Sequence, residues 1–205
     1  ELSLEMLENF NPCFVLDLTA TPKKESNIIS YVDAVQLKNE HMVKLPVIVY
    51  NRDSQSEVLI DAIDLRNKLE EIANAEYAKT GKYIRPIALF QAQPKGKEDA
   101  TPFEKLRDKL VDAGIPAEQI AIRTADVNEL KNTDLMSPSC PIRYIITVNA
   151  LKEGWDCPFA YILASLANKT SQVDVEQILG RILRLPHTSQ HMQSALNMSL
   201  SLIHI

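Results

Sequence analysis

Short apolar runs alternate with longer amphipathic stretches along most of the chain. The apolar runs predict strands at 14–18, 45–50, 84–91, 119–123, 143–148 and 160–165. Helices are predicted between and after them, over 57–79, 102–113 and 173–185. Such alternation predicts an α/β fold, with a mostly parallel sheet covered by helices on both faces.

Polar residues follow two of the predicted strands. Thr19, Ala20 and Thr21 come after the 14–18 run, and the segment 154–156 follows the 143–148 run. In parallel sheets, ligand-binding groups collect at the carboxyl ends of the strands. We therefore expect both segments to lie at that edge.

The predicted helix 173–185 carries a polar stripe. At 100° per residue, Asp174, Gln177, Arg181 and Arg184 share one face, opposite the apolar residues. Gly180 costs about 1 kcal/mol relative to Ala inside a helix, so it suggests a close approach by another group. The alternative is an amphipathic surface helix whose arginines are merely solvated.

Composition narrows the class of protein. The chain has 205 residues and a net charge of −5, which argues against nucleic-acid binding through bulk electrostatics. Its three cysteines form no C-x-x-C pair, a pattern that fits a reducing cytoplasm. His187 and His191 have no third ligand nearby, so no metal site is expected. No apolar run is long enough to span a membrane.

Three motifs together resemble those of superfamily 2 helicases of the DEAD/DEAH-box group. Gln177 to Arg184 reads Q-x-x-G-R-x-x-R and is similar to motif VI, and Gly154-Trp155-Asp156 is similar to motif V. Thr19-Ala20-Thr21-Pro22 is similar to motif III, and the three occur in the family's order. The wording Glu-Gly-Trp-Asp-Cys-Pro most resembles the restriction (Res) subunit of type III restriction enzymes.

This resemblance implies a RecA-like lobe of the P-loop NTPase class and a role for each motif residue. Arg181 and Arg184 would point at the γ-phosphate of ATP, with Arg184 as the arginine finger and Gln177 as a polar contact. Asp156 would bind the ribose, with Gly154 beside the nucleotide and nucleic-acid contacts. Thr19, Ala20 and Thr21 would couple the two lobes.

One position departs from the family's pattern. Val148-Asn149 stands where DEAD-box members have Thr-Asp, so a hydroxyl contact to phosphate is not expected here. By resemblance, Asn149 is instead the candidate contact to nucleic acid.

The sequence contains no G-x-x-x-x-G-K-[ST] and no Walker B acid pair. The resemblance therefore covers the end of a first RecA-like lobe with a linker (1–40) and a C-terminal RecA-like lobe (41–198). The linker itself is expected at 23–40, and ATP with Mg²⁺ would be held mainly by the upstream lobe. Residues 199–205 are a candidate for non-native sequence.

The leading hypothesis is an ATP-dependent DNA helicase or translocase of the cytoplasm. Single- or double-stranded DNA and a methyltransferase subunit would be its partners, and the fragment alone would be inactive. Two alternatives stay open. One is a stand-alone, non-catalytic nucleic-acid-binding module with the same fold, and the other is a flavodoxin-like ligand-binding domain.

Overall fold

The computed structural model describes residues 6, 9–18, 27–93, 101–148, 156–166, 180 and 182–204. The chain divides into two compact units, Glu1–Asp33 and Ala34–Ile205, and the division falls inside the predicted linker 23–40. All strands of the described residues belong to the second unit.

The prediction of a buried strand at 14–18 is wrong. Its backbone forms no strand, and Phe14, Leu16 and Leu18 are 73%, 58% and 88% exposed. A strand satisfies its backbone groups by pairing with a neighbour, and no described residue pairs with this segment. The apolar run therefore stays exposed in the unit Glu1–Asp33.

The second unit is built on a six-stranded sheet whose pairings are all parallel. In chain order the strands are β1 (Val47–Arg52), β2 (Ile87–Gln91), β3 (Ile120–Ile122), β4 (Tyr144–Thr147), β5 (Ala160–Ser165) and β6 (Ser199–His204). In space they follow the order β1-β6-β5-β2-β4-β3. This confirms the α/β class and the parallel sheet.

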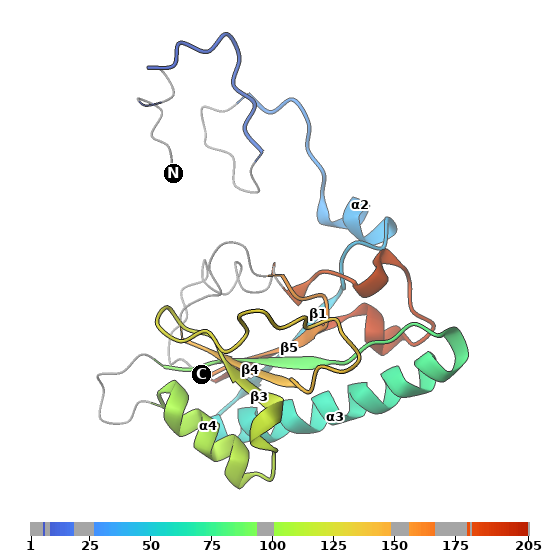
Figure 1. Ribbon diagram of the computed structural model, residues 1–205. Coiled ribbons are helices and arrows are strands. Elements are labelled where there is room, and N and C mark those ends of the chain that lie inside the picture. The colour runs from blue at the N-terminus through green and yellow to red at the C-terminus, as the bar shows by residue number, and fades with distance from the viewer. Residues whose placement is uncertain are drawn as a thin grey trace. The chain divides into compact units, whose positions relative to one another are not determined.

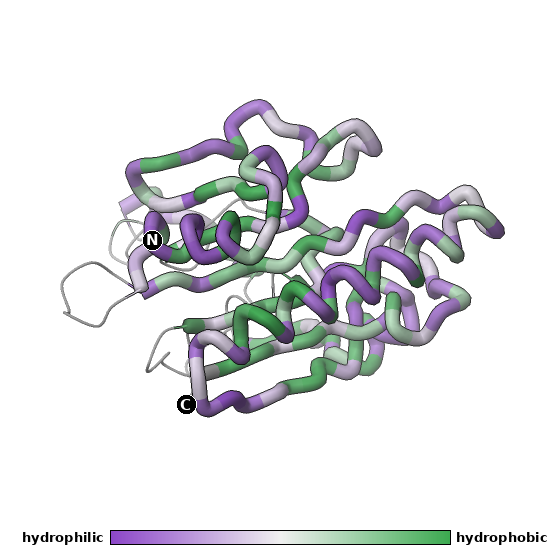
Figure 2. Tube along the Cα trace, turned by 90° about the horizontal axis from the view of Figure 1, so that it is seen from below, coloured by the Kyte–Doolittle hydropathy of each residue, from purple (hydrophilic) through white to green (hydrophobic). Residues whose placement is uncertain are grey.

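Strands β2 to β5 are buried along their whole length, as continuous apolar runs in a parallel sheet should be. Figure 2 shows hydrophobic stretches of the chain, in green, alternating with hydrophilic ones. Five of the six strands match predicted runs. The sixth, β6, falls in the segment 199–205 and was not predicted as a strand.

The long helix α3 (Gln55–Thr80) confirms the helix predicted at 57–79. Ser54 Oγ accepts a hydrogen bond from the backbone N–H of Glu57 at 3.2 Å, which satisfies one open donor of the first turn. Gly81 ends the helix with a φ of 70°, a left-handed conformation that glycine adopts at little cost. Val58, Ala62 and other buried residues pack this helix against the sheet.

The remaining helical elements are short. They are α2 (Ala34–Asn39), α4 (Phe103–Asp112) and three 3₁₀ turns at Ala117–Gln119, Pro186–Thr188 and Ser194–Asn197. Helices α3 and α4 lie on the same face of the sheet (Figure 1). Most of the helix predicted at 173–185 lies outside the described residues.

An irregular segment between β3 and β4 lies on the opposite side of the sheet from α3 and α4 (Figure 1). Buried Arg85 holds it by donating to the carbonyls of Leu135 at 2.6 Å, Ser137 at 2.8 Å and Ile142 at 2.8 Å. The guanidinium therefore fixes backbone that has no regular structure of its own.

Candidate functional site

Asp156 and Arg184 form an ion pair that joins two of the three motif segments. Nη1 of Arg184 donates a hydrogen bond to Oδ2 of Asp156. The Arg184 side chain is 62% exposed and the Asp156 side chain is 42% exposed. An exposed pair of this kind contributes little to stability. Because both side chains are partly exposed, their polar groups are accessible to a ligand.

The pair lies at the amino ends of the strands. Asp156 lies just before the amino end of β5, and Arg184 pairs with Val43, just before the amino end of β1. The two strands run in the same direction, because each is parallel to β6. The expectation that Asp156 marks the carboxyl edge is therefore wrong, because residues 149–155 intervene between β4 and Asp156.

Arg184 is not helical, contrary to the prediction that it shares a helical face with Gln177 and Arg181. Gly180 and Ile182 are helical, but Arg184 forms an antiparallel bridge with Val43. The physical reason is Pro186, which disfavours helical backbone at Leu185. The N–H of Leu185 instead donates to the carbonyl of Met42 at 2.9 Å.

Lys44 connects these elements and was missed by the sequence analysis. Its side chain is fully buried, and Nζ donates to the carbonyls of Pro158 at 2.8 Å and Ala160 at 2.6 Å. Nζ also lies 4.1 Å from the centre of the Tyr161 ring. The available signal was a lone lysine between Val43 and Leu45, at the entrance to an apolar strand.

Burial sets the protonation behaviour around Lys44. It lowers the pKa of Lys44 to about 7, against the opposing effects of Cys157 and Asp156. Burial also raises the pKa of the Cys157 thiol to about 11 and raises that of the Tyr161 hydroxyl. The Cys157 thiol is therefore protonated at neutral pH and is a poor nucleophile.

A second buried cluster secures the segment that follows Arg184. Both carboxylate oxygens of Glu76 are used: Oε1 accepts from the N–H of Met192 at 3.2 Å and contacts Nδ1 of His191 at 3.1 Å, and Oε2 accepts from the N–H of Gln193 at 2.9 Å. Burial lowers the pKa of His191, with Glu76 opposing the shift. The described residues contain no group of three His, Cys, Asp or Glu that could hold a metal ion.

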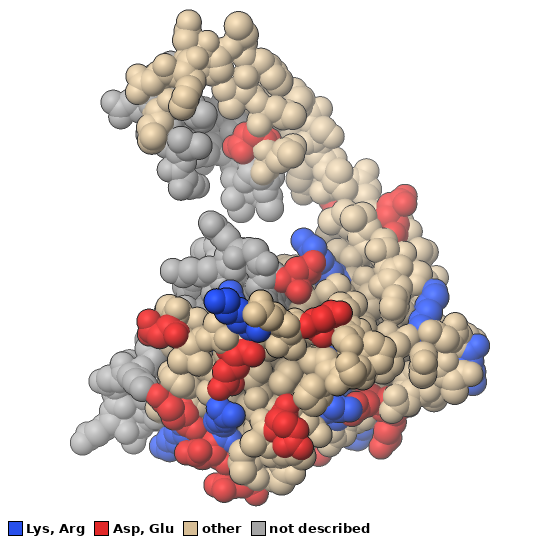
Figure 3. Space-filling view, in the orientation of Figure 1, with Lys and Arg blue, Asp and Glu red and all other residues tan. Residues whose placement is uncertain are grey.

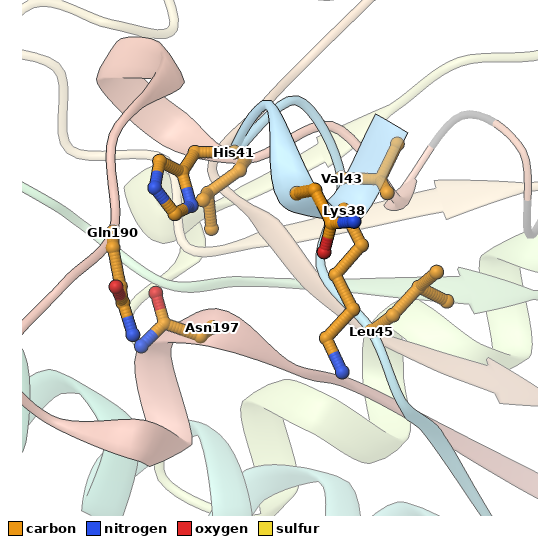
Figure 4. A pocket seen from close by; sticks show the side chains of 8 residues that line it. Lys38, His41, Val43, Leu45, Gln190 and Asn197 are labelled. Atoms are coloured by element: carbon orange, nitrogen blue, oxygen red, sulfur yellow. The ribbon is translucent and has the colours of Figure 1, made fainter. Parts of the chain in front are cut away.

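A cavity of about 270 Å³ lies next to the Val43–Arg184 bridge (Figure 4). Its polar lining residues are Lys38, Asn39, His41, Gln190 and Asn197. In Figure 4 the side chains of Gln190 and Asn197 point toward one another. The cavity adds polar groups near the ion pair but brings in no further motif residue.

The structure places two of the predicted site residues, Asp156 and Arg184, and brings them together. The others lie outside the described residues; they are Thr19, Ala20, Thr21, Asn149, Gly154, Gln177 and Arg181. Gly180 is exposed, and a Cβ added to it would meet nothing within 4 Å among the described residues. The described residues therefore do not make the close approach that a glycine at position 180 suggests.

Chemically, the arrangement presents an accessible guanidinium whose present partner is an accessible carboxylate. A guanidinium binds carboxylate and phosphate oxygens through the same planar fork of N–H donors. Arg184 is therefore able to exchange the Asp156 carboxylate for an anionic ligand of similar geometry.

Comparison of the chain with models of known protein families finds no match, and comparison with curated proteins finds none either. Within the part of the chain that the structure describes, no helix is long and apolar enough to cross a membrane.

Proposed function

We propose that the chain is the C-terminal RecA-like lobe of an ATP-dependent DNA helicase or translocase, similar to the restriction subunit of a type III restriction–modification enzyme. The observation that carries this proposal is the contact between Asp156 and Arg184. These residues come from two motifs that the resemblance assigns to one nucleotide, and they are 28 positions apart in the sequence.

In the proposed cycle, Arg184 leaves Asp156 and donates to the γ-phosphate of ATP bound by the upstream lobe. Its exposed side chain leaves room for that approach. The guanidinium then stabilises charge that develops on the transferred phosphoryl group, an effect of about 10³-fold or more in rate for arginine fingers. Asp156, released from Arg184, accepts a hydrogen bond from a ribose hydroxyl.

Magnesium is assigned to the upstream lobe. Among the described residues no group of three His, Cys, Asp or Glu could hold a metal ion. Arg181 and Gln177 keep their proposed places beside the phosphates, and Gly154 its place near the nucleotide. Thr19, Ala20 and Thr21 would carry closure of the cleft from one lobe to the other.

DNA is the proposed polymer substrate. Figure 3 shows basic and acidic side chains interspersed over this face of the unit Ala34–Ile205, without a broad basic patch. Together with the net charge of −5, this favours contacts from backbone amides and single polar groups such as Asn149. A methyltransferase subunit and a cytoplasmic location belong to the same proposal.

The test is ATP hydrolysis by the full-length protein with and without single- and double-stranded DNA. The proposal predicts hydrolysis that DNA stimulates. DNA binding that is independent of ATP, with no hydrolysis under any condition, would contradict it and would instead indicate a non-catalytic nucleic-acid-binding module.

A further inference from the structure

Lys44 occupies a position that is costly for a lysine. Its side chain is fully buried, and moving an ammonium group out of water costs several kcal/mol unless it is well paired. Its hydrogen-bond partners are two neutral carbonyls, those of Pro158 and Ala160. An apolar side chain would fill the space without that cost, so the useful property of Lys44 is its N–H donors.

Those donors hold the segment that carries Asp156. Pro158 and Ala160 come two and four residues after Asp156, and their carbonyl oxygens are 2.8 Å and 2.6 Å from Lys44 Nζ. The lysine thereby fixes the backbone through which the chain passes from Asp156 into β5.

The backbone of the same residue holds the segment that carries Arg184. The N–H of Lys44 donates to the carbonyl of Leu183 at 2.5 Å, and Val43 pairs with Arg184 itself. Lys44 therefore contacts the segments that carry both residues of the ion pair. Its side chain contacts the segment of Asp156, and its main chain contacts the segment of Arg184. Contacts from a single residue thus reach both of the segments that carry the two functional groups.

We propose that Lys44 is the positioning residue that holds Arg184 and Asp156 in register for the transferred phosphate. This inference rests on the proposed function. Lys44 touches neither substrate nor reacting atoms and acts through the backbone on each side of the ion pair. Removing its donors lets the 156–160 segment shift relative to Arg184, and displacements of about 1 Å can cost about 10²-fold in rate.

The experiment compares Lys44→Met with wild type in the full-length protein. We expect kcat for ATP to fall by about 10- to 100-fold, while KM for ATP changes by less than about 3-fold, because the upstream lobe supplies most ground-state contacts. Affinity for ADP with aluminium fluoride, which mimics the transferred phosphoryl, should fall in parallel with kcat, and affinity for ADP alone should not.

A double variant separates positioning from a general loss of structure. If Lys44 acts through Arg184, adding Lys44→Met to Arg184→Lys should lower kcat little further, because the group to be positioned is already impaired. Independent, multiplicative losses would overturn the proposal.

Lys82→Met is the matched control. Lys82 Nζ donates to Ser189 Oγ at 2.9 Å and so also joins distant segments, but this single side-chain contact lies five residues beyond Arg184 and involves no residue near Asp156. Its kcat should stay within about 2-fold of wild type. If Lys44→Met does not fold, Lys44→Gln replaces it, because the amide group keeps N–H donors without the buried charge. The kcat of Lys44→Gln should then lie between those of the wild type and Arg184→Ala.

The outcomes distinguish the two proposals. Wild-type kcat in Lys44→Met or Lys44→Gln, with Arg184→Ala inactive, overturns the role of Lys44 alone. Absence of ATP hydrolysis in the wild type, or normal turnover by Arg184→Ala, overturns the proposed function itself.

Discussion

Nη1 of Arg184 donates to Oδ2 of Asp156 across 28 positions of sequence, at the amino ends of β1 and β5. Both side chains are substantially exposed, so the pair is available for exchange with a ligand and adds little to stability. Lys44, which is buried, donates hydrogen bonds to the backbone that follows Asp156.

Asp156→Asn separates the two roles of the carboxylate. The free energy of unfolding should change by less than about 1 kcal/mol, because exposed ion pairs contribute little. KM for ATP in the full-length protein should rise, since a neutral amide oxygen is a weaker acceptor for the proposed ribose hydroxyl than the carboxylate. Chemical denaturation and steady-state kinetics measure the two effects; a large loss of stability with unchanged KM would show that Asp156 is structural.

Lys44 should make stability depend on pH. Its pKa is about 7 in the folded chain and 10.5 ordinarily, so between these values the unfolded chain binds more protons. Stability from this residue therefore rises as pH increases from about 7 toward 10.5, and as pH falls again it is lost over the same range, completely by about pH 7. The groups facing Nζ are Asp156, Cys157 and the Tyr161 ring.

Denaturation of wild type and Lys44→Met at several pH values between about 6 and 10 measures this slope. The difference between the two proteins should grow in favour of the wild type with rising pH. Parallel profiles would mean that Lys44 keeps its ordinary pKa in the folded state.

Arg85→Met should destabilise the second unit by about 3 kcal/mol or more, because one buried and two partly buried carbonyls each lose a charged donor. Arg107→Met is the control, since Arg107 forms an exposed pair with Glu129 at 3.1 Å and should cost at most about 1 kcal/mol. Urea denaturation measures both. Equal losses would show that the hydrogen bonds of Arg85 contribute no more to stability than an exposed ion pair does.

Glu76→Gln should loosen the segment after Arg184. The amide replaces one acceptor oxygen with a donor, facing the N–H groups of Met192 and Gln193, at a cost of about 1–3 kcal/mol. Hydrogen exchange at these two amides should accelerate. Glu71→Gln, on the exposed face of the same helix, should leave exchange unchanged; identical behaviour of both variants would exclude the anchoring role of Glu76.

Local pattern was enough to predict most of the sheet and the long helix. Strands β2 to β5 appear as apolar runs because these parallel strands are buried along their whole length, and Gly81 marks the end of α3. The same pattern led to the wrong prediction at 14–18. Apolar content indicates that a strand can form, but pairing depends on a neighbour that the sequence pattern does not identify.

The candidate site was predicted only in part. Asp156 and Arg184 were identified by motif, but helical periodicity placed Arg184 on a helix that ends before it. That periodicity carries no information on the bridge to Val43. Lys44 was missed because its partners, Pro158 and Ala160, are 114 and 116 positions away and contribute only backbone carbonyls.

The measurement that most directly tests the role of Arg184 is ATP turnover by Arg184→Ala in the full-length protein, with Arg107→Ala as a control for loss of an exposed arginine. We predict that kcat falls by about 10³-fold while ATP binding stays within a few-fold of wild type and Arg107→Ala remains active. Turnover by Arg184→Ala at the wild-type rate would contradict the assignment of this lobe to an ATP-driven motor.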